Sequence, residues 1–147
     1  MKYLSISVEQ TQKIARDFAK TLKGGDVVAL YGELGAGKTT FIQAVAAALG
    51  IKRRIPSPTF VLARSYRIPK GVKPALQGKT LYHVDLYRLK SATDLGSIDL
   101  QEIMRDTQNI TMIEWAEKAK SALPGSRIDI IMVYKGERKR EITISKP

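Results

Sequence analysis

A glycine-rich stretch of the sequence, Gly32 to Thr39, has the pattern G-x-x-x-x-G-K-[ST] of a phosphate-binding loop. Glycine lacks a Cβ atom, so the backbone can turn tightly and point successive N–H groups inward as a cradle for an anion. We expect Lys38 to reach the β- and γ-phosphates of a nucleotide and the Thr39 hydroxyl to bind Mg²⁺. The residues expected to contact the nucleotide here are Gly32, Glu33, Leu34, Gly35, Ala36, Gly37, Lys38, Thr39 and Thr40.

The segments around this stretch have the context that such a loop requires. The apolar run Val27 to Tyr31 predicts a strand buried on both faces, and the alanine-rich run from Lys38 to Leu49 predicts a helix that stops at Gly50. A glycine turn that binds nothing is the alternative, but the complete motif between these elements favours phosphate binding. No N-K-x-D tetrad for guanine occurs in the sequence, so ATP is favoured over GTP.

Two acidic residues end apolar strand candidates elsewhere in the chain. Asp85 closes the run 81–85, and Glu114 closes the run 110–114. The carboxyl ends of parallel strands face the ligand crevice, so both acids are expected beside the phosphate loop, although strand-end acids also serve as helix caps. With Thr39 they would form an oxygen-ligand site for Mg²⁺.

The remaining patterns predict the fold. Ser7 and Gln10 form a capping box for an amphipathic helix over 8–23. The other expected elements are an extended loop at 55–59, a strand at 60–66, a loop at 67–79, strands at 80–85 and 110–114, a helix near 91–106, and an antiparallel hairpin at 127–134 and 139–145. The prediction is one α/β domain over 1–147, a three-layer P-loop NTPase with a mixed, mostly parallel sheet and an antiparallel C-terminal edge.

Composition narrows the possible chemistry and location. The chain has no cysteine and one histidine, which excludes disulfides and a zinc site, and leaves a hard metal ion held by oxygen. No signal peptide or membrane span is apparent, so we expect a cytoplasmic protein. The net charge is +11, and residues 51 to 79 carry eight Lys or Arg and no acid. This segment is equally compatible with a phosphate-polymer contact and with a solvated surface.

Four sequence blocks in this order resemble the bacterial TsaE (YjeE) family of small ATPases: GELGAGKTTF at 32–41, SPTF at 57–60, YHVDLYRL at 82–89 and IEWAEK at 113–118. The resemblance implies a Mg²⁺-dependent P-loop ATPase needed to form threonylcarbamoyladenosine at position 37 of tRNAs that read codons beginning with A. It implies partnership with a threonylcarbamoyl transferase complex, the TsaB and TsaD proteins, which slow or partner-dependent ATP hydrolysis would reset or regulate.

The resemblance also assigns roles to residues by position. Lys38, Asp85 and Glu114 match catalytic positions, and Thr39, Asp85 and Glu114 match the Mg²⁺ ligands, with the division of work between the two acids left open. Thr11 matches a family threonine near the base. Thr59 is expected in a loop that folds over the γ-phosphate, as in other P-loop proteins, and Trp115 is expected beside the nucleotide because it adjoins Glu114. The alternatives are an exposed turn threonine for Thr59, a sheet-edge anchor for Trp115 and an ordinary surface threonine for Thr11. His83 is interpreted as a strand residue and not as a base, and Arg88 as a phosphate contact, a partner contact or half of an ion pair.

The loop at 67–79 departs from the family by being longer and more basic. We expect this loop, with Lys52 to Arg54, to lie near the tRNA backbone or near an acidic face of a partner. The basic segment 51–79 would then contact tRNA weakly, or tRNA would be contacted only indirectly through the partner. Two other functions stay open at this stage. A small-molecule kinase would use lid arginines, for which Arg64 and Arg67 are candidates. A non-enzymatic RNA binder would use nucleotide for stability, but the chain lacks an RNP-type aromatic strand.

Overall fold

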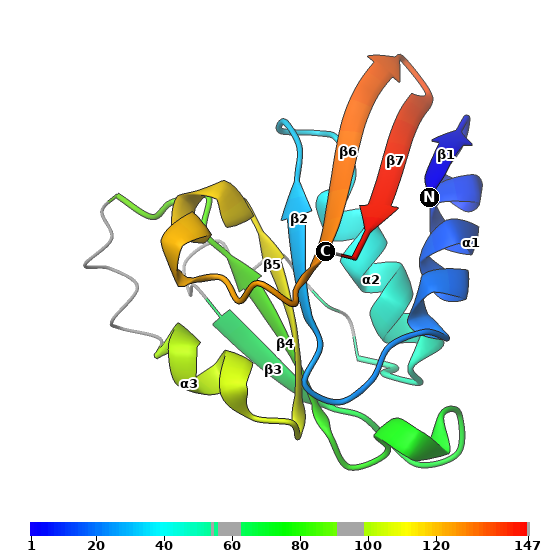
Figure 1. Ribbon diagram of the computed structural model, residues 1–147. Helices are drawn as coiled ribbons and strands as arrows, with labels where there is room; N and C mark the ends of the chain where they lie inside the picture. The colour runs from blue at the N-terminus through cyan, green and yellow to red at the C-terminus, as the bar shows by residue number, and fades with distance from the viewer. Residues whose placement is uncertain (54, 56–62, 91–98, 147) are drawn as a thin grey trace.

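A single mixed sheet organises the molecule. The computed structural model describes residues 1–53, 55, 63–90 and 99–146. Within these residues seven strands pair in the order β1-β7-β6-β2-β5-β4-β3 (Figure 1). Their bounds are β1 Lys2–Ser5, β2 Val27–Tyr31, β3 Ala63–Arg67, β4 Thr80–Asp85, β5 Asn109–Glu114, β6 Ile128–Gly136 and β7 Lys139–Ser145.

The sheet is parallel at its centre and antiparallel at both edges. Strands β6, β2, β5 and β4 run parallel to their neighbours in this central block. Strand β7 pairs antiparallel with β6, and β1 pairs antiparallel with β7, which confirms the expected C-terminal edge. At the other edge, β3 is antiparallel to β4, a direction that the sequence did not predict. Residues 56–62, and with them most of the expected loop and the start of the expected strand at 60–66, lie outside the described residues.

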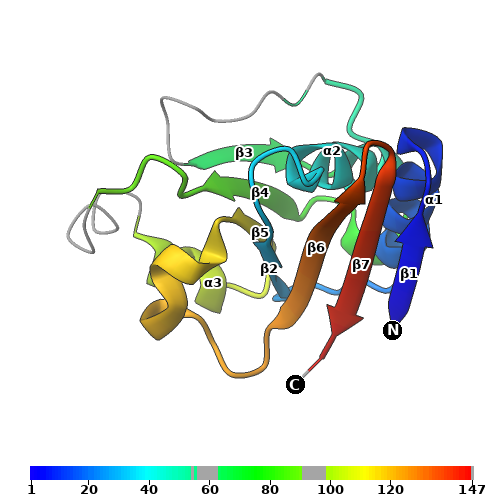
Figure 2. The ribbon, with the colours of Figure 1, turned by 90° about the horizontal axis from the view of Figure 1, so that it is seen from above.

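Helices cover both faces of the sheet (Figures 1 and 2). On one face lie α1 (Val8–Ala19) and α2 (Lys38–Ala48), and on the other lie α3 (Leu100–Arg105) and the 3₁₀ helix η3 (Ala116–Ala122). Strand β2 shows why three layers form, because its side chains alternate between two cores. Val28 and Leu30 pack with the α1 and α2 side, whereas Val27 and Ala29 pack with the α3 side.

The helix expected over 8–23 starts as predicted but ends early. Ser7 Oγ accepts a hydrogen bond from the Gln10 amide at 3.1 Å, so the N-terminal cap is confirmed. At the other end, the Lys73 ammonium donates to the carbonyls of Ala19, Lys20 and Leu22 at 2.8–2.9 Å. A cation at the negative end of the helix dipole satisfies carbonyls that have no partner within the helix. One lysine of the basic loop is therefore a structural cap.

The other element boundaries follow the sequence closely. The α2 helix begins at Lys38, and the β6–β7 hairpin covers the two segments expected for it. The helix expected near 91–106 appears as α3 at its C-terminal end, and 91–98 lie outside the described residues. The loop at 67–79 contains one 3₁₀ turn, η1 (Pro74–Leu76). Among the described residues no helix has the length and apolarity needed to cross a bilayer.

Candidate functional site

The glycine-rich loop joins β2 to α2 and lies tightly against β6. Gly37 precedes α2 with φ 102°, a conformation that residues with a Cβ atom rarely adopt. Gly32 has φ 152°, and a Cβ atom there would lie 2.5 Å from the Met132 carbonyl oxygen. The two outer glycines of the motif are thus required by backbone conformation and by the approach of β6. This geometry leaves the loop backbone free to curve around an anion.

Lys38 is buried at the start of α2, with 4% of its surface exposed. Its ammonium donates to the carbonyl oxygens of Gly32 and, at 3.1 Å, Glu33. The same ammonium lies 4.1 Å from the centroid of the Trp115 ring. Burial lowers the pKa of Lys38, and the nearby carboxylates, led by Glu114, oppose this shift. Lys38 is consequently a desolvated cation at the position where the motif predicts phosphate binding.

The two predicted acids lie side by side at the ends of neighbouring parallel strands. Asp85 and Glu114 are register partners in β4 and β5, and both are buried. The Thr39 hydroxyl donates to the Glu114 carboxylate at 2.9 and 3.0 Å. Asp85 Oδ1 accepts from the Tyr87 amide at 2.9 Å, so this acid also stabilises the turn after β4. The structure therefore brings together all three residues expected to bind Mg²⁺.

A buried histidine, His83, contacts the Glu114 carboxylate. His83 has no exposed surface, and its Nε2 lies 2.5 Å from Glu114 Oε2. The other ring nitrogen, Nδ1, has no hydrogen-bond partner among the described residues. A protonated Nε2 makes the ring a donor to the carboxylate. His83 is a strand residue, as interpreted from the sequence, but its contact with Glu114 was not predicted.

Trp115 follows Glu114 in an unusual backbone conformation. Its φ of 57° and ψ of 44° place it in the left-handed region, which is rare for a bulky side chain. The ring centroid lies 5.1 Å from that of Tyr87, and the ring faces the Lys38 ammonium. Such strain persists when the surrounding contacts hold the residue in place, and it often marks a functional site.

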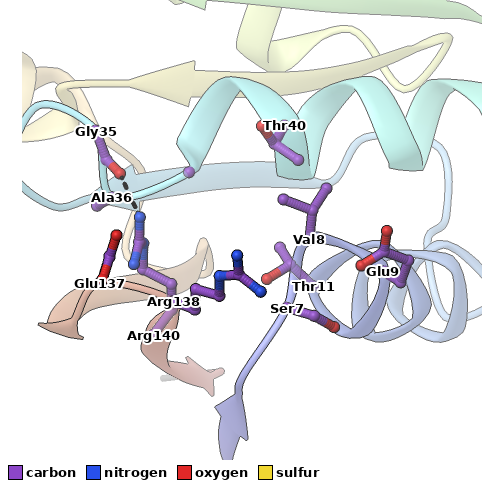
Figure 3. Close-up of a pocket in the computed structure, with 11 residues that line it drawn as sticks. Ser7, Val8, Glu9, Thr11, Gly35, Ala36, Thr40, Glu137, Arg138 and Arg140 are labelled. Atoms are coloured by element: carbon purple, nitrogen blue, oxygen red, sulfur yellow. Dashed lines mark hydrogen bonds between the residues drawn. The ribbon is translucent and has the colours of Figure 1, made fainter.

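The loop separates two hollows. We call the first the carboxylate hollow; it has a volume of about 340 Å³ and is lined by Leu34 to Thr40, Asp85, Tyr87, Arg88, Glu114 and Trp115. We call the second the hairpin hollow; it has a volume of about 330 Å³ and is lined by Ser7, Val8, Glu9, Thr11, Gly35, Ala36, Gly37, Thr40, Glu137, Arg138 and Arg140 (Figure 3). Because both hollows share the loop backbone, a molecule bound at the loop can extend into each.

The hairpin hollow contains residues that the sequence analysis missed. Arg140 donates through Nη2 to the Gly35 carbonyl at 3.1 Å, and Arg138 borders the same space (Figure 3). The basic turn between β6 and β7 was visible in the sequence, but its position beside the loop follows from the pairing of β6 with β2.

Of the two threonines expected near the nucleotide, the structure describes Thr11 but not Thr59. Thr11 is not an ordinary surface threonine, because 5% of it is exposed and its hydroxyl lies 2.8 Å from Ser5 Oγ. It borders the hairpin hollow, on the side of the loop away from Asp85 and Glu114. Thr59 lies outside the described residues.

The oxygen atoms of the carboxylate hollow suit a magnesium ion. No group of three or more His, Asp or Glu side chains positioned for a metal occurs in the described part of the chain. Two carboxylates and one hydroxyl, from Asp85, Glu114 and Thr39, nevertheless match a hard cation that takes its other ligands from phosphates and water. The donor set fits Mg²⁺ bound together with a nucleotide.

The fold and the loop together define the class of protein. A buried parallel strand, β2, leads into the G-x-x-x-x-G-K-T loop and a helix, and its neighbour in the sheet, β5, ends in Glu114 beside the loop threonine. This is a P-loop nucleotide-binding protein of the α/β class.

Comparison with known proteins identifies the family. The family model "Threonylcarbamoyl adenosine biosynthesis protein TsaE" matches residues 5–142, so the chain belongs to the TsaE family. The tRNA threonylcarbamoyladenosine biosynthesis protein TsaE of Bacillus subtilis is 39% identical over 99% of this chain and 85% of its own length. That of Treponema pallidum is 37% identical over 99% and 100%, respectively. A crystal structure of Bacillus subtilis YdiB superimposes with a TM-score of 0.79 at 34% identity, covering 99% of this chain and 84% of that one.

Proposed function

We propose that this chain is a Mg²⁺-dependent ATPase required for formation of threonylcarbamoyladenosine at position 37 of tRNAs that read codons beginning with A. The observation that carries the proposal is the contact between Thr39 of the loop and Glu114 of β5, next to Asp85. This contact joins the phosphate cradle to a carboxylate pair suited to magnesium. The names of relatives that match almost the full chain support the tRNA pathway.

Each residue near the loop has a role in this proposal. The loop amides and Lys38 bind the β- and γ-phosphates, and Lys38 exchanges its carbonyl partners for phosphate oxygens. Thr39, Asp85 and Glu114 hold Mg²⁺ and its waters, and the carboxylate pair orients the attacking water. When bound, the ion neutralises charge that develops on the phosphates.

The hairpin hollow is proposed to take the base end of the nucleotide. Thr11 and Arg138 border it, and it opens from the loop on the side away from the acids. Trp115 stays beside the Lys38 ammonium on the phosphate side. Thr59 keeps its proposed role near the γ-phosphate on the basis of the sequence motif.

The proposal includes a partner, a threonylcarbamoyl transferase complex formed by the TsaB and TsaD proteins, which ATP hydrolysis resets or regulates. Nucleotide and Mg²⁺ would have to displace the hydrogen bonds from Lys38 to Glu33 and from Thr39 to Glu114. This supports slow turnover by the isolated chain and faster turnover in a complex. A role on tRNA also supports location in the cytoplasm.

The test combines genetics with enzymology. The gene is deleted, and threonylcarbamoyladenosine in bulk tRNA is measured by mass spectrometry after complementation with wild type or Lys38→Ala. We expect the modification to return with wild type and not with the variant. Return of the modification with Lys38→Ala would instead support an RNA binder that needs no nucleotide.

Phosphate release by the purified chain with its partners separates an ATPase from a kinase. A kinase would give stoichiometric phosphorylated acceptor in place of inorganic phosphate. The two lid candidates do not support a kinase, because neither Arg64 nor Arg67 lines the carboxylate hollow. Arg67 pairs with Thr80, at the opposite end of β4 from Asp85.

A further inference from the structure

A long part of the chain carries basic residues without any acid. The 51 residues between Glu33 and Asp85 contain no Asp or Glu and nine Lys or Arg. The nine are Lys38, Lys52, Arg53, Arg54, Arg64, Arg67, Lys70, Lys73 and Lys79. Their positions in the fold show which of them can act on a partner.

Several of these cations have other roles or other locations. Lys38 belongs to the phosphate loop, and Lys73 caps α1. Lys79 lies 3.5 Å from the Gln108 side chain, and Arg67 is on the α3 face of β3. Arg54 lies outside the described residues. Four exposed cations then remain for one surface: Lys52, Arg53, Arg64 and Lys70.

Two of these cations, Lys52 and Arg53, line a third hollow, which we call the basic hollow, and Arg64 and Lys70 belong to segments that pack beside it. It has a volume of about 750 Å³ and is lined by Gln43, Ala47, Gly50, Ile51, Lys52, Arg53, Ile55 and Val72. Two residues of the 67–79 loop, Pro69 and Val72, lie close to Gly50, and the exposed Lys70 stands between them in the sequence. The Arg53 guanidinium lies 5.7 Å from the Tyr66 ring centroid, and Arg64 is on the same face of β3 as Tyr66.

The basic hollow is distant from the nucleotide site. It lies at the C-terminal end of α2, whereas Lys38 begins that helix and Thr39 follows. An 11-residue helix is about 16 Å long. The two sites can therefore be occupied at the same time, and variants in one need not disturb the other.

We propose that the basic hollow binds the sugar–phosphate backbone of tRNA. Phosphate contacts are made by exposed Lys and Arg, whereas the cores of protein interfaces are poor in Lys. The floor between the cations is uncharged, with Gln43 and a Val72 side chain that is 59% exposed, and it offers space for a ribose or an unstacked base. The choice of tRNA rests on the proposed role in tRNA modification, but not on ATP hydrolysis.

Binding of fluorescently labelled tRNA tests the proposal. Anisotropy is measured against salt for the full chain and for the variant Lys52→Gln/Arg53→Gln/Arg64→Gln/Lys70→Gln. We expect at least a tenfold loss of affinity near 0.1 M salt and a fall of about 3 in the slope of log K against log salt, since each phosphate contact adds roughly 0.7–0.9. Mg-ATP binding, followed by calorimetry, should be unchanged in this variant.

A control variant removes the same charge elsewhere: Lys13→Gln/Lys120→Gln/Lys135→Gln/Lys146→Gln. It should bind tRNA within about threefold of wild type, because the contacts are local. Equal losses in both variants would show a general charge effect and overturn the proposal, as would no loss in either. Competition by polyglutamate as strong as by unlabelled tRNA would point to an acidic protein partner and would also overturn it. If the variant of the basic hollow bound tRNA as wild type does but failed to restore the modification in cells, the proposed function would stand and this surface would be rejected as a tRNA site.

Discussion

The two ends of α2 use basic residues in opposite ways. At its N-terminal end, Lys38 is 4% exposed and Glu114 is 3% exposed, and both have defined hydrogen-bond partners. At its C-terminal end, Lys52 and Arg53 are exposed and line the basic hollow. Buried, partnered groups keep a fixed geometry that suits chemistry at one atom. Exposed cations provide an attractive field with little orientation, which suits a charged polymer.

The largest expected effect is at the buried end. Lys38→Met should abolish measurable Mg-ATP binding, at least a hundredfold loss by calorimetry, because the loop loses its charge toward phosphate. Burial lowers the pKa of Lys38 in the folded protein, so below the ordinary lysine pKa the charged side chain costs folding free energy. The melting temperature of the nucleotide-free variant should accordingly be equal to or above that of wild type at neutral pH. ATP binding that survives, or a much lower melting temperature, would contradict this assignment.

The acids should separate binding from turnover. Asp85→Asn and Glu114→Gln should each retain nucleotide but lose about 10²-fold or more of phosphate release, because they act on the metal and the attacking water. Calorimetry gives the affinity, and phosphate release in the presence of the partner proteins gives the rate. Arg67→Gln, at the far end of the sheet, is the control and should change neither. Full turnover by Glu114→Gln would remove it from the proposed mechanism.

A smaller effect on Mg²⁺ dependence is expected at His83, which contacts Glu114. His83→Leu should raise the Mg²⁺ concentration needed for half-maximal turnover by about tenfold, because Glu114 loses the donor that orients it. The metal dependence of ATP binding, measured by calorimetry, should shift in the same direction. His83→Gln keeps a donor at a similar reach and should recover part of the loss. A drop in melting temperature with an unchanged Mg²⁺ dependence would make His83 a packing residue.

The smallest effect is expected on stability, at Lys73. This lysine belongs to the basic segment but, unlike the exposed cations, has defined hydrogen-bond partners at the end of α1. Lys73→Met should lower the free energy of unfolding by about 1 kcal/mol, since three carbonyls at the end of α1 lose their charged donor. Urea unfolding measures this change. Lys70→Met, three residues away and exposed, is the matched control and should leave stability unchanged. Equal stability of the two variants would refute the cap.

Local sequence patterns predicted the phosphate loop and its flanking elements, because their conformation depends on residues that are close in sequence. The strand, loop and helix over 27–48 could be read from a buried run, glycine positions and an alanine-rich stretch. The position of Asp85 and Glu114 beside the loop was also predicted, because the ends of parallel strands meet at one edge of a sheet, but their direct pairing was not. The roles of these residues, the role of Thr59 and the single domain over 1–147 stay predictions.

The features that were missed depend on residues far apart in the chain. Strand β1 has four residues, and its conformation comes from pairing with β7 rather than from its own pattern. The contacts Arg140–Gly35 and His83–Glu114 require the register of the sheet, and the Lys73 cap requires a loop packed against α1. None of these partners lies within 30 residues of the other, so no sequence window contains both.

The pairing of β1 with β7 also has a consequence for synthesis on the ribosome. Thr11 is held through Ser5, and the backbone partners of β1 extend from Arg140 to Thr143. The first strand therefore stays unpaired until residues 140–143 have been synthesised and have left the exit tunnel. Thr11 and Arg140 both line the hairpin hollow, so this hollow is completed only after β7 has folded, more than 100 residues after the phosphate loop has been made.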